Sequence, residues 1–399
     1  MQPYADNAPW KDRLFIGDYG YALAIEKQTG RELWYNSLPE TGNGIVMLLY
    51  NDGLLYAGSK GKLIAVEPET GKIIWESNII RGHDLKNLVT SLASDICIAA
   101  PPKGDPWEDR LFIGTYRHVL AIEKNSGQKL WSASLPGHKF FPTVTVTVLY
   151  DDGMLYAGSK GKLFAVDPGS GEITWENSFK SLVHGHMCMT VANNDKHKKD
   201  RFFISALGQV LAIEKHTGHE LWCADLPETG FGGYRYFATV LYDNGLLYAG
   251  CGGKVFAADP ETGNIAWKKE LVKTVGKSGF RKTFRRFFST QGTDISMAGN
   301  YGKNQLFIGV CGYAAAIDKQ TGRESWRTSL PGVGKTLVTV LCEDGFLYAA
   351  SDKKLFAINT EKGKIMWEKA LRYDYVNMAT AENYSQINDL AAFRTQLER

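Results

Sequence analysis

The sequence predicts an all-β fold, a ring of eight four-stranded antiparallel sheets that a strand near the C-terminal end of the chain closes. Three observations carry this prediction. A tryptophan recurs at intervals of roughly 40 to 60 residues, the length of one blade in a repeat protein. Each of these tryptophans follows the glycine of a Thr-Gly, Ser-Gly or Lys-Gly turn by four residues. Short runs of strand-forming residues, such as residues 162–166, precede the turns. The eight tryptophans are Trp34, Trp75, Trp131, Trp175, Trp222, Trp267, Trp326 and Trp367.

The repeats alternate between two types. Odd units contain a segment like Asp-Arg-Leu-Phe-Ile-Gly followed by Leu-Ala-Ile-Glu-Lys, as at residues 109–124. Even units contain Asp-Gly-Leu-Leu-Tyr-Ala-Gly, as at residues 52–58. Four tandem pairs of this kind make eight blades. We therefore expect an eight-bladed β-propeller.

The two ends of the chain predict how the ring closes. Three odd units begin with similar first strands, at residues 95–99, 186–190 and 294–298, whereas the first unit has none. A matching segment stands at residues 375–379, near the other end. We expect this segment to complete the first blade and to leave few free strand edges. The chain 1–399 is then a single domain, with a short amphipathic helix expected in the tail 383–399.

Composition excludes several classes of function. A formal net charge of +3 gives no reason to expect nucleic acid as a partner. The first residues show no secretory signal, and no uncharged apolar run approaches the roughly 20 residues that span a bilayer. The six cysteines form no CxxC pair and are predicted to be buried free thiols rather than metal ligands. We expect a cytoplasmic protein that does not bind membranes.

The signature Ala-Val-Asp-Pro-x-x-Gly-x-x-x-Trp, at residues 165–175, resembles the repeat of the PQQ-like, or quinoprotein alcohol dehydrogenase-like, eight-bladed propellers. The resemblance extends over nearly the whole chain. Quinone enzymes of that family hold their cofactor with a vicinal disulfide, a calcium site and a stacking tryptophan. This chain has no adjacent cysteines and no evident acidic cluster for calcium, so no cofactor is expected. The connectors at residues 37–42 and 225–230 are similar to those of quinone-free intracellular fungal members, some of which act in natural-product biosynthesis.

Positions where the repeats diverge are candidates for function. The inner strand of each blade, with the connector leading into it, is predicted to line one mouth of the central channel. The predicted catalytic residues are His186, Asp95 and Asp294 for proton transfer, and Arg235 and Lys335 for stabilising negative charge. Alternative roles are backbone hydrogen bonding for the two aspartates, a core position for the histidine, and solvated rim charges for the two cations. The predicted substrate-binding residues are Tyr375, Asn377, Tyr236, His184, Asn43, Thr143, Tyr116 and Phe287.

The connectors between second and third strands are expected to open at the same mouth. The largest insertion, residues 273–291, precedes Asp294 and carries six basic residues and four phenylalanines, including Phe287. It is interpreted as a lid over an apolar or anionic ligand. A plain surface loop and a docking segment for an acidic partner are the alternatives.

Two classes of function follow from these residues. The first is a cofactor-independent enzyme that performs acid–base assisted dehydration or cyclisation, including a hetero-Diels–Alder type, on an apolar, oxygenated small molecule. Such a protein would be a lyase or cyclase rather than a quinone-dependent dehydrogenase. The second is a protein-interaction scaffold that uses the same face without catalysis, and a sugar-binding propeller is a third alternative. An enzyme requires His186 and Arg235, whereas a scaffold requires the basic insertion.

Overall fold

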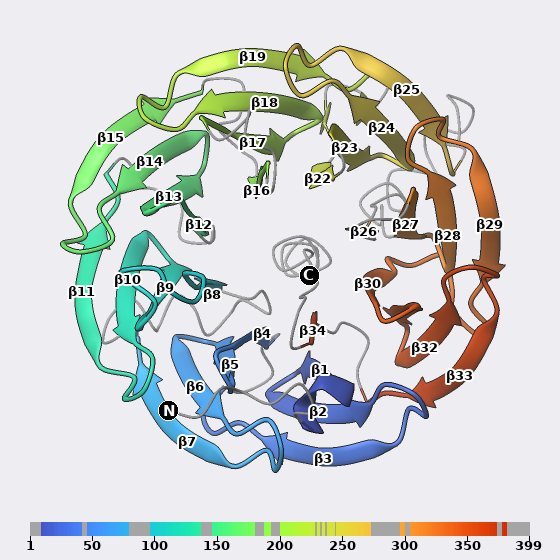
Figure 1. The fold of residues 1–399 in the computed structure, drawn as a ribbon, viewed down its shortest axis with the longest axis horizontal. Helices are drawn as coiled ribbons and strands as arrows, with labels where there is room; N and C mark the ends of the chain where they lie inside the picture. Colours follow the sequence, from blue (N-terminus) through green and yellow to red (C-terminus); the bar gives the residue numbers. More distant parts are fainter. Residues whose placement is uncertain are drawn as a thin grey trace, which may run out of the picture.

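The strands form eight four-stranded antiparallel sheets arranged as blades around a central axis (Figure 1). This confirms the predicted all-β, eight-bladed propeller. Among the residues described, no helix is long and apolar enough to cross a membrane. The computed structural model describes residues 9–41, 46–79, 96–136, 146–179, 187–192, 200–227, 230–231, 234–235, 238–243, 245–272, 296–299, 304–372 and 377–380.

Each blade runs from an inner strand near the axis to an outer strand at the rim, and we call these positions A, B, C and D. A short 3-10 helix, η1 (Pro9–Asp12), precedes the first described strand. Blades 1 to 4 consist, from A to D, of β34 (Asn377–Ala379), β1 (Arg13–Asp18), β2 (Tyr21–Glu26) and β3 (Glu32–Ser37); β4 (Met47–Asn51), β5 (Leu54–Ser59), β6 (Lys62–Val66) and β7 (Ile73–Asn78); β8 (Ile96–Ala99), β9 (Arg110–Thr115), β10 (His118–Glu123) and β11 (Lys129–Ser134); β12 (Thr147–Asp151), β13 (Met154–Ser159), β14 (Lys162–Val166) and β15 (Ile173–Ser178).

The other four blades repeat the order, and one small hairpin stands outside it. Blades 5 to 8 consist, from A to D, of β16 (Cys188–Val191), β17 (Arg201–Ala206), β18 (Gln209–Glu214) and β19 (Glu220–Asp225); β22 (Ala238–Asp243), β23 (Leu246–Cys251), β24 (Lys254–Ala258) and β25 (Ile265–Glu270); β26 (Ser296–Gly299), β27 (Gln305–Val310), β28 (Tyr313–Asp318) and β29 (Glu324–Ser329); β30 (Thr339–Glu343), β31 (Phe346–Ser351), β32 (Lys354–Asn359) and β33 (Ile365–Ala370). The hairpin, β20 (Gly230–Phe231) with β21 (Tyr234–Arg235), belongs to the connector between blades 5 and 6.

The predicted closure is confirmed. Strand β34 pairs antiparallel with β1, with Gly17 opposite Asn377 and Phe15 opposite Ala379. The first blade is therefore built from both halves of the chain, and its inner strand comes from the end of the described sequence. This pairing satisfies an edge of β1 that would otherwise be open to non-specific strand addition.

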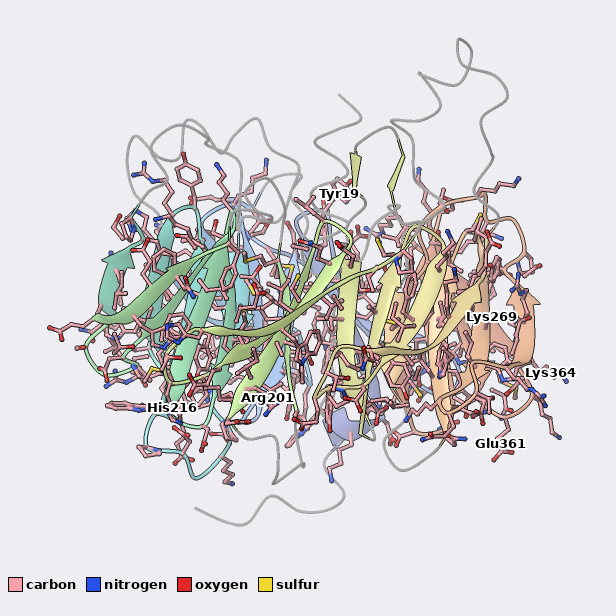
Figure 2. The ribbon with its side chains drawn as sticks, turned by 90° about the horizontal axis from the view of Figure 1, so that it is seen from above. Tyr19, Arg201, His216, Lys269, Glu361 and Lys364 are labelled. Carbon is pink, nitrogen blue, oxygen red and sulfur yellow. The ribbon has the colours of Figure 1, made fainter. Side chains whose placement is uncertain are left out.

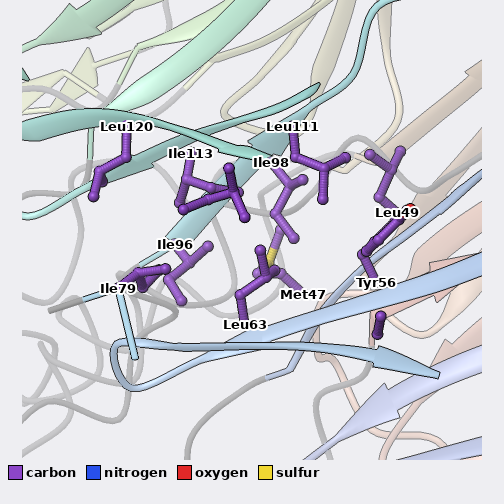
Figure 3. Packing of buried hydrophobic residues seen from close by; sticks show 12 residues of the cluster. Met47, Leu49, Tyr56, Leu63, Ile79, Ile96, Ile98, Leu111, Ile113 and Leu120 are labelled. Carbon is purple, nitrogen blue, oxygen red and sulfur yellow. The ribbon is translucent and has the colours of Figure 1, made fainter. Parts of the chain in front are cut away.

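The hydrophobic core consists of layers between neighbouring blades rather than one central core. One such layer joins blades 2 and 3, where Met47 and Leu49 of β4 pack against Ile96 and Ile98 of β8 (Figure 3). Alternate residues of β4 point the other way, so that Leu48 packs in the layer between blades 1 and 2. Strand alternation therefore places the side chains of an inner strand between blades, so that this strand is covered on both faces.

The repeated tryptophans and glycines form one interlocking contact that recurs around the ring. The indole N–H of each outer-strand tryptophan donates to a carbonyl oxygen in the C–D turn of the next blade, at 2.8 to 3.1 Å in all eight cases. The indole ring covers the glycine of that turn: a Cβ at Gly171 would lie 2.6 Å from Trp131 Cε3. In the last of these contacts, Trp367 of blade 8 donates to Lys27 of blade 1. The sequence repeat therefore encodes the joints between blades.

Buried lysines mark every second joint. Lys27, Lys124, Lys215 and Lys319, at equivalent positions of the odd blades, are each at most 6% exposed. Three of them pair with a carboxylate at the end of the inner strand in the preceding even blade, namely Glu343, Asp151 and Asp243 respectively for Lys27, Lys215 and Lys319. The equivalent residue opposite Lys124 is Asn51, whose Oδ1 is buried without a hydrogen-bond partner among the described residues. Burial lowers the pKa of Lys124, and the negative charges of Asp52, Glu108 and Asp109 oppose this shift only in part.

Three of the four alternate joints, from odd to even blades, use an arginine at the start of strand B instead, and blade 7 has Gln305 at this position. Arg13 Nη1 donates to the carbonyl oxygen of Pro68 at 2.7 Å, and Arg110 Nη1 donates to that of Pro168 at 2.8 Å. Arg201 differs in its acceptor, because its Nη1 pairs with the side-chain carboxylate of Glu261 across blades 5 and 6 at 2.8 Å. The two alternating repeat types seen in the sequence therefore correspond to two kinds of blade joint.

Asn51→Asp should stabilise the protein by about 1 kcal/mol at neutral pH. It supplies the carboxylate that the other three lysines find at this position of the inner strand, and the cost of burying the new charge offsets part of the gain. The attraction exists only while Lys124 is protonated, so the gain should shrink as the pH rises through the lowered pKa of that lysine. Denaturation midpoints of the variant and the wild type at neutral and alkaline pH measure both effects. A destabilised variant at neutral pH would contradict the assigned contact.

Candidate functional site

The turns between strands B and C and the starts of the blade-to-blade connectors lie on one face of the ring, which we call the connector face. In all eight blades the first residue after strand D donates its backbone N–H to a carbonyl oxygen of the B–C turn, as Leu38 does to Gly20 at 2.9 Å and Leu371 to Lys353. Figure 2 shows Tyr19, in the first B–C turn, on this face, and His216 and Glu361 on the opposite one. The two kinds of connector therefore open on the same side, as expected.

Two residues of the predicted channel column engage the neighbouring blade. Asn377 is 4% exposed, and its Oδ1 accepts a hydrogen bond from the backbone N–H of Leu48 in blade 2 at 2.9 Å. Cys97 is 7% exposed, and its Sγ lies 3.8 Å from the carbonyl oxygen of Val148 in blade 4. Both side chains help to join inner strands. A substrate contact for Asn377 stays a prediction.

Three other predicted site residues are placed on the connector face. Lys335 is exposed in the connector between blades 7 and 8, and Tyr116 is half-buried in the B–C turn of blade 3. Arg235 lies in β21, in the small hairpin between blades 5 and 6, rather than in the inner strand β22. The structure therefore spreads these three residues over well-separated blades.

The remaining predicted site residues lie outside the described part of the chain. They are His186, Asp95, Asp294, Tyr375, Tyr236, His184, Asn43, Thr143 and Phe287, and the insertion 273–291 and the tail 383–399 belong with them.

The six cysteines all lie among the described residues and are free thiols, which confirms that part of the prediction. Their expected burial holds for Cys97, Cys251 and Cys342 only. Cys223 is exposed, because the outer strand β19 presents alternate side chains to solvent. Cys311 is half-buried in the B–C turn of blade 7, where burial raises the pKa of its thiol against the opposing effect of the nearby Lys335.

The B–C turns give the connector face a positive character. Their two-residue loops hold four cations, Lys60, Arg117, Lys160 and Lys353, against one carboxylate, Asp352. The A–B turns of the even blades, on the opposite side, carry exposed carboxylates such as Asp52 and Asp152. Burial and the charge of Arg117 lower the pKa of Lys160. This asymmetry favours approach of negatively charged groups to the connector face.

A stack of aromatic rings and a guanidinium group occupies the joint between blades 8 and 1 on this face. The rings of Tyr21 and Tyr35 stack with centroids 4.9 Å apart. The guanidinium carbon of Arg372, an exposed residue just after β33, lies 3.7 Å from the centroid of the Tyr35 ring. Burial raises the pKa of Tyr35, and its hydroxyl makes no hydrogen bond within the described part of the chain. The stack therefore offers an exposed cation held in place by an aromatic surface.

A related arrangement at the joint between blades 6 and 7 is internally satisfied. The Tyr313 hydroxyl donates to the carbonyl oxygen of Leu271 at 2.7 Å, and burial raises the pKa of that phenol to about 12. The Arg327 guanidinium lies 4.3 Å from the Tyr313 ring centroid and also bonds Glu324. Because its partners are all within the fold, this second stack is a structural contact. The stack at blades 8 and 1 has no such carboxylate on Arg372 among the described contacts.

The connector between blades 7 and 8 is held rigidly against the connector face. Gly334 donates its N–H to Asp352 Oδ2 at 2.6 Å, and the Oγ atoms of Thr336 and Ser351 are 2.7 Å apart. Lys354 Nζ donates to the carbonyl oxygen of Pro331 at 2.9 Å. These bonds fix the backbone that presents Lys335 to solvent.

Sequence reasoning missed Tyr21, Tyr35, Lys353 and Arg372. A signal for one of them was available: Tyr35 directly follows the repeated tryptophan, a position that holds glutamate in three of the even blades. The same comparison of repeats that selected the inner-strand column would have selected this outer-strand position. Arg372 lies in a connector, where the repeats are too divergent to align.

The described residues do not match the donor set that the quinone-dependent relatives imply. No two cysteines are adjacent in the sequence, so a vicinal disulfide cannot form. Within the same part of the chain, no three His, Cys, Asp or Glu side chains converge on a point that could hold a metal ion. The proposed function therefore involves neither a quinone nor calcium.

The fold and its repeated joints define this protein as an eight-bladed propeller built from PQQ-like repeats. A family model described as "outer membrane protein assembly factor BamB" (PQQ_2) matches residues 10–97, 115–306 and 310–385, and the chain belongs to that family. Tetrathionate hydrolase of Acidithiobacillus ferrooxidans is 23% identical over 63% of this chain and 49% of its own length. BamB of Nitrosomonas eutropha is 25% identical over 49% and 54%, and the quinoprotein alcohol dehydrogenase PedH of Pseudomonas putida is 27% identical over 36% and 26%. The chain thus spans about half or less of the length of these relatives.

Solved structures agree on the fold. BamB of Moraxella catarrhalis superposes with a TM-score of 0.57 at 15% identity, covering 85% of this chain and 94% of that one. Sqt1 of Saccharomyces cerevisiae gives 0.58 at 13% identity, covering 85% and 93%. At these identities the likeness shows architecture and carries no activity across.

Proposed function

We propose that this protein is an interaction scaffold that binds a partner protein on its connector face. The observation that carries the proposal is the Arg372–Tyr35–Tyr21 stack, in which Arg372 is exposed and both tyrosines are half-buried, on a face with a rigid connector and four cationic turn residues. Tyrosine and arginine are the residues most enriched at the energetic centres of protein interfaces. A pre-ordered backbone reduces the conformational entropy lost on binding.

Two further facts support a scaffold. The buried ion pairs of the described chain join blades, as Lys319 and Asp243 do, so these charges serve the fold. The family model that matches most of the chain is named for an assembly factor. We propose a cytoplasmic location, in accord with six free thiols, which a reducing compartment preserves.

Site-specific photo-crosslinking tests this proposal. A benzophenone amino acid at Tyr19 on the connector face should give a discrete protein adduct in a lysate of the host cell, and the adduct should re-form with the purified partner. The same group at His216, on the opposite face, serves as the control and should give none (Figure 2). Equal labelling from both positions, or no adduct from Tyr19, would contradict the proposal that a partner protein binds on the connector face.

The second candidate is the cofactor-independent dehydratase or cyclase. It is favoured by the position of Arg235, which lies in a hairpin of the connector between blades 5 and 6. Under this proposal His186 with Asp95 or Asp294 transfers protons and Arg235 stabilises developing negative charge on a small apolar, oxygenated substrate. Replacing His186 or Arg235 with Ala should abolish turnover and leave the thermal midpoint unchanged.

A further inference from the structure

We infer that the partner segment bound on the connector face is an acidic polypeptide, and that it docks on a strip that crosses blades 7, 8 and 1. The strip consists of Lys335, Lys353, Arg372, Tyr35 and Tyr21. This inference rests on the proposed scaffold function and deepens it, because it names the docking position and the chemistry of the occupant.

Hydrogen bonds made by neighbouring residues, together with two ring contacts, link these five residues from one end of the strip to the other. The B–C turn of blade 7 donates from Gly312 N–H to the carbonyl oxygen of Thr336, next to Lys335. Gly334 on the other side of Lys335 bonds Asp352, which precedes Lys353 in the B–C turn of blade 8.

The series then continues into blade 1. The Lys353 carbonyl oxygen accepts the N–H of Leu371, which precedes Arg372, and Arg372 stacks on Tyr35 at 3.7 Å. Tyr35 in turn stacks on Tyr21. The residues of the strip are therefore held in a fixed order from the connector after blade 7 to blade 1.

The charge of the strip is unbalanced. Lys335, Lys353 and Arg372 are exposed cations. Asp352, the carboxylate between them, accepts the Gly334 N–H at 2.6 Å and offsets only one of these three charges. Asp18, near the tyrosines, is 1% exposed and accepts the Tyr19 N–H at 2.8 Å. Carboxylates of a partner would supply the missing negative charge, and the guanidinium of Arg372 could bind one of them bidentately.

The two tyrosines favour a polypeptide over a diffuse anionic surface. Their stacked rings form an apolar, rigid platform beside the cations, which can pack against the side chains and backbone between acidic residues. A purely electrostatic surface would need no such platform. The anchored connector at Lys335 further fixes the spacing of the charges.

Fluorescence anisotropy with the full-length protein tests the inference. The probe is a fluorescein-labelled dodecapeptide of alternating Glu and Ser, and a Lys–Ser peptide is its counterpart. The acidic peptide should bind, and the triple variant Lys335→Glu, Lys353→Glu, Arg372→Glu should weaken binding about tenfold or more, because each change replaces an attraction with a repulsion.

The matched control is Lys72→Glu, Lys362→Glu, Lys364→Glu. These three exposed lysines lie in the C–D turns of blades 2 and 8, on the face opposite the connector face, and their replacement changes the net charge by the same amount. The control should weaken binding less than about twofold. Thermal midpoints verify that both triples are folded.

Several outcomes would overturn the inference. Equal weakening by both triples would show that net charge alone attracts the peptide, and absent binding would exclude an acidic occupant. Binding of phosphatidylserine vesicles in place of the peptide would assign the strip to a membrane surface. If the Tyr19 crosslink forms but does not respond to the strip triple, the scaffold stands and this docking position is wrong.

Discussion

Glu343→Gln should lower the free energy of unfolding by about 3 kcal/mol, because it removes the carboxylate that pairs with the buried Lys27. Glu343 holds the closure of the ring from blade 8. One carboxylate oxygen pairs with Lys27 Nζ, and the other accepts the hydroxyl of Thr380, which follows β34. The Glu343 side chain therefore contacts blade 1 both at Lys27, which follows β2, and at Thr380, which follows β34. The denaturant midpoint of the purified variant measures the loss.

Two matched variants separate the ion pair from general damage. Asp344→Asn removes the second, 59% exposed carboxylate near Lys27 and should cost at most about 1 kcal/mol. Burial raises the pKa of Glu343 despite the adjacent Lys27 ammonium, which indicates that the desolvation of the pair is costly. The double variant Lys27→Met, Glu343→Leu should therefore recover most of the stability. A double variant as unstable as Glu343→Gln would show that packing, not charge, sets the loss.

Gly171→Ala should destabilise the protein by about 3 kcal/mol, the sum of a backbone cost and a steric cost. Gly171 has φ of +80°, and an added Cβ would lie 2.6 Å from Cε3 and 2.8 Å from Cδ2 of Trp131 in the preceding blade. The indole cannot retreat without breaking its hydrogen bond to the Pro168 carbonyl oxygen. Chemical denaturation of the variant and the wild type measures the effect.

Gly153→Ala in the same blade is the control. Gly153 has φ of +78°, nearly the same backbone conformation, but an added Cβ there meets no heavy atom within 4 Å. It should cost only the backbone part, about 1 kcal/mol. Equal losses at the two glycines would mean that the indole contact contributes nothing to the joint between blades.

The fold was predictable because the tryptophan and the glycine that form each joint between blades recur in every repeat of the sequence. Gly171 and Trp131 each recur once per blade, and the contact they form differs little from joint to joint. The closure was predictable for a related reason: the missing first strand of unit 1 has a recognisable copy ending at Ala379. Burial of Lys27 and its equivalents was not predicted, since a lysine in a polar turn gives no sign of a carboxylate contributed by the preceding blade.

The site was less predictable than the fold. The side chains of the inner strands alternate between two neighbouring blades, and Asn377 Oδ1 accepts a hydrogen bond from Leu48 of blade 2, a contact that the sequence pattern did not predict. The tyrosine and arginine stack depends on Arg372 in a connector, which has no counterpart in the repeat to compare with. Divergence between repeats identifies candidates, but only the packing of neighbouring blades decides which side chains remain exposed.

The order in which the ribosome makes this chain has a consequence for its folding. Strands β1 to β3 of blade 1 precede the other described strands in the chain, whereas its inner strand β34 is the last described strand to be synthesised. Through most of translation the nascent ring must therefore remain an open arc with β1 exposing an unpaired edge. Closure pairs residues as far apart in sequence as Phe15 and Ala379, a non-local contact of the kind that forms slowly in folding. Chaperones that shield strand edges should matter most for this protein in the interval before β34 has been synthesised.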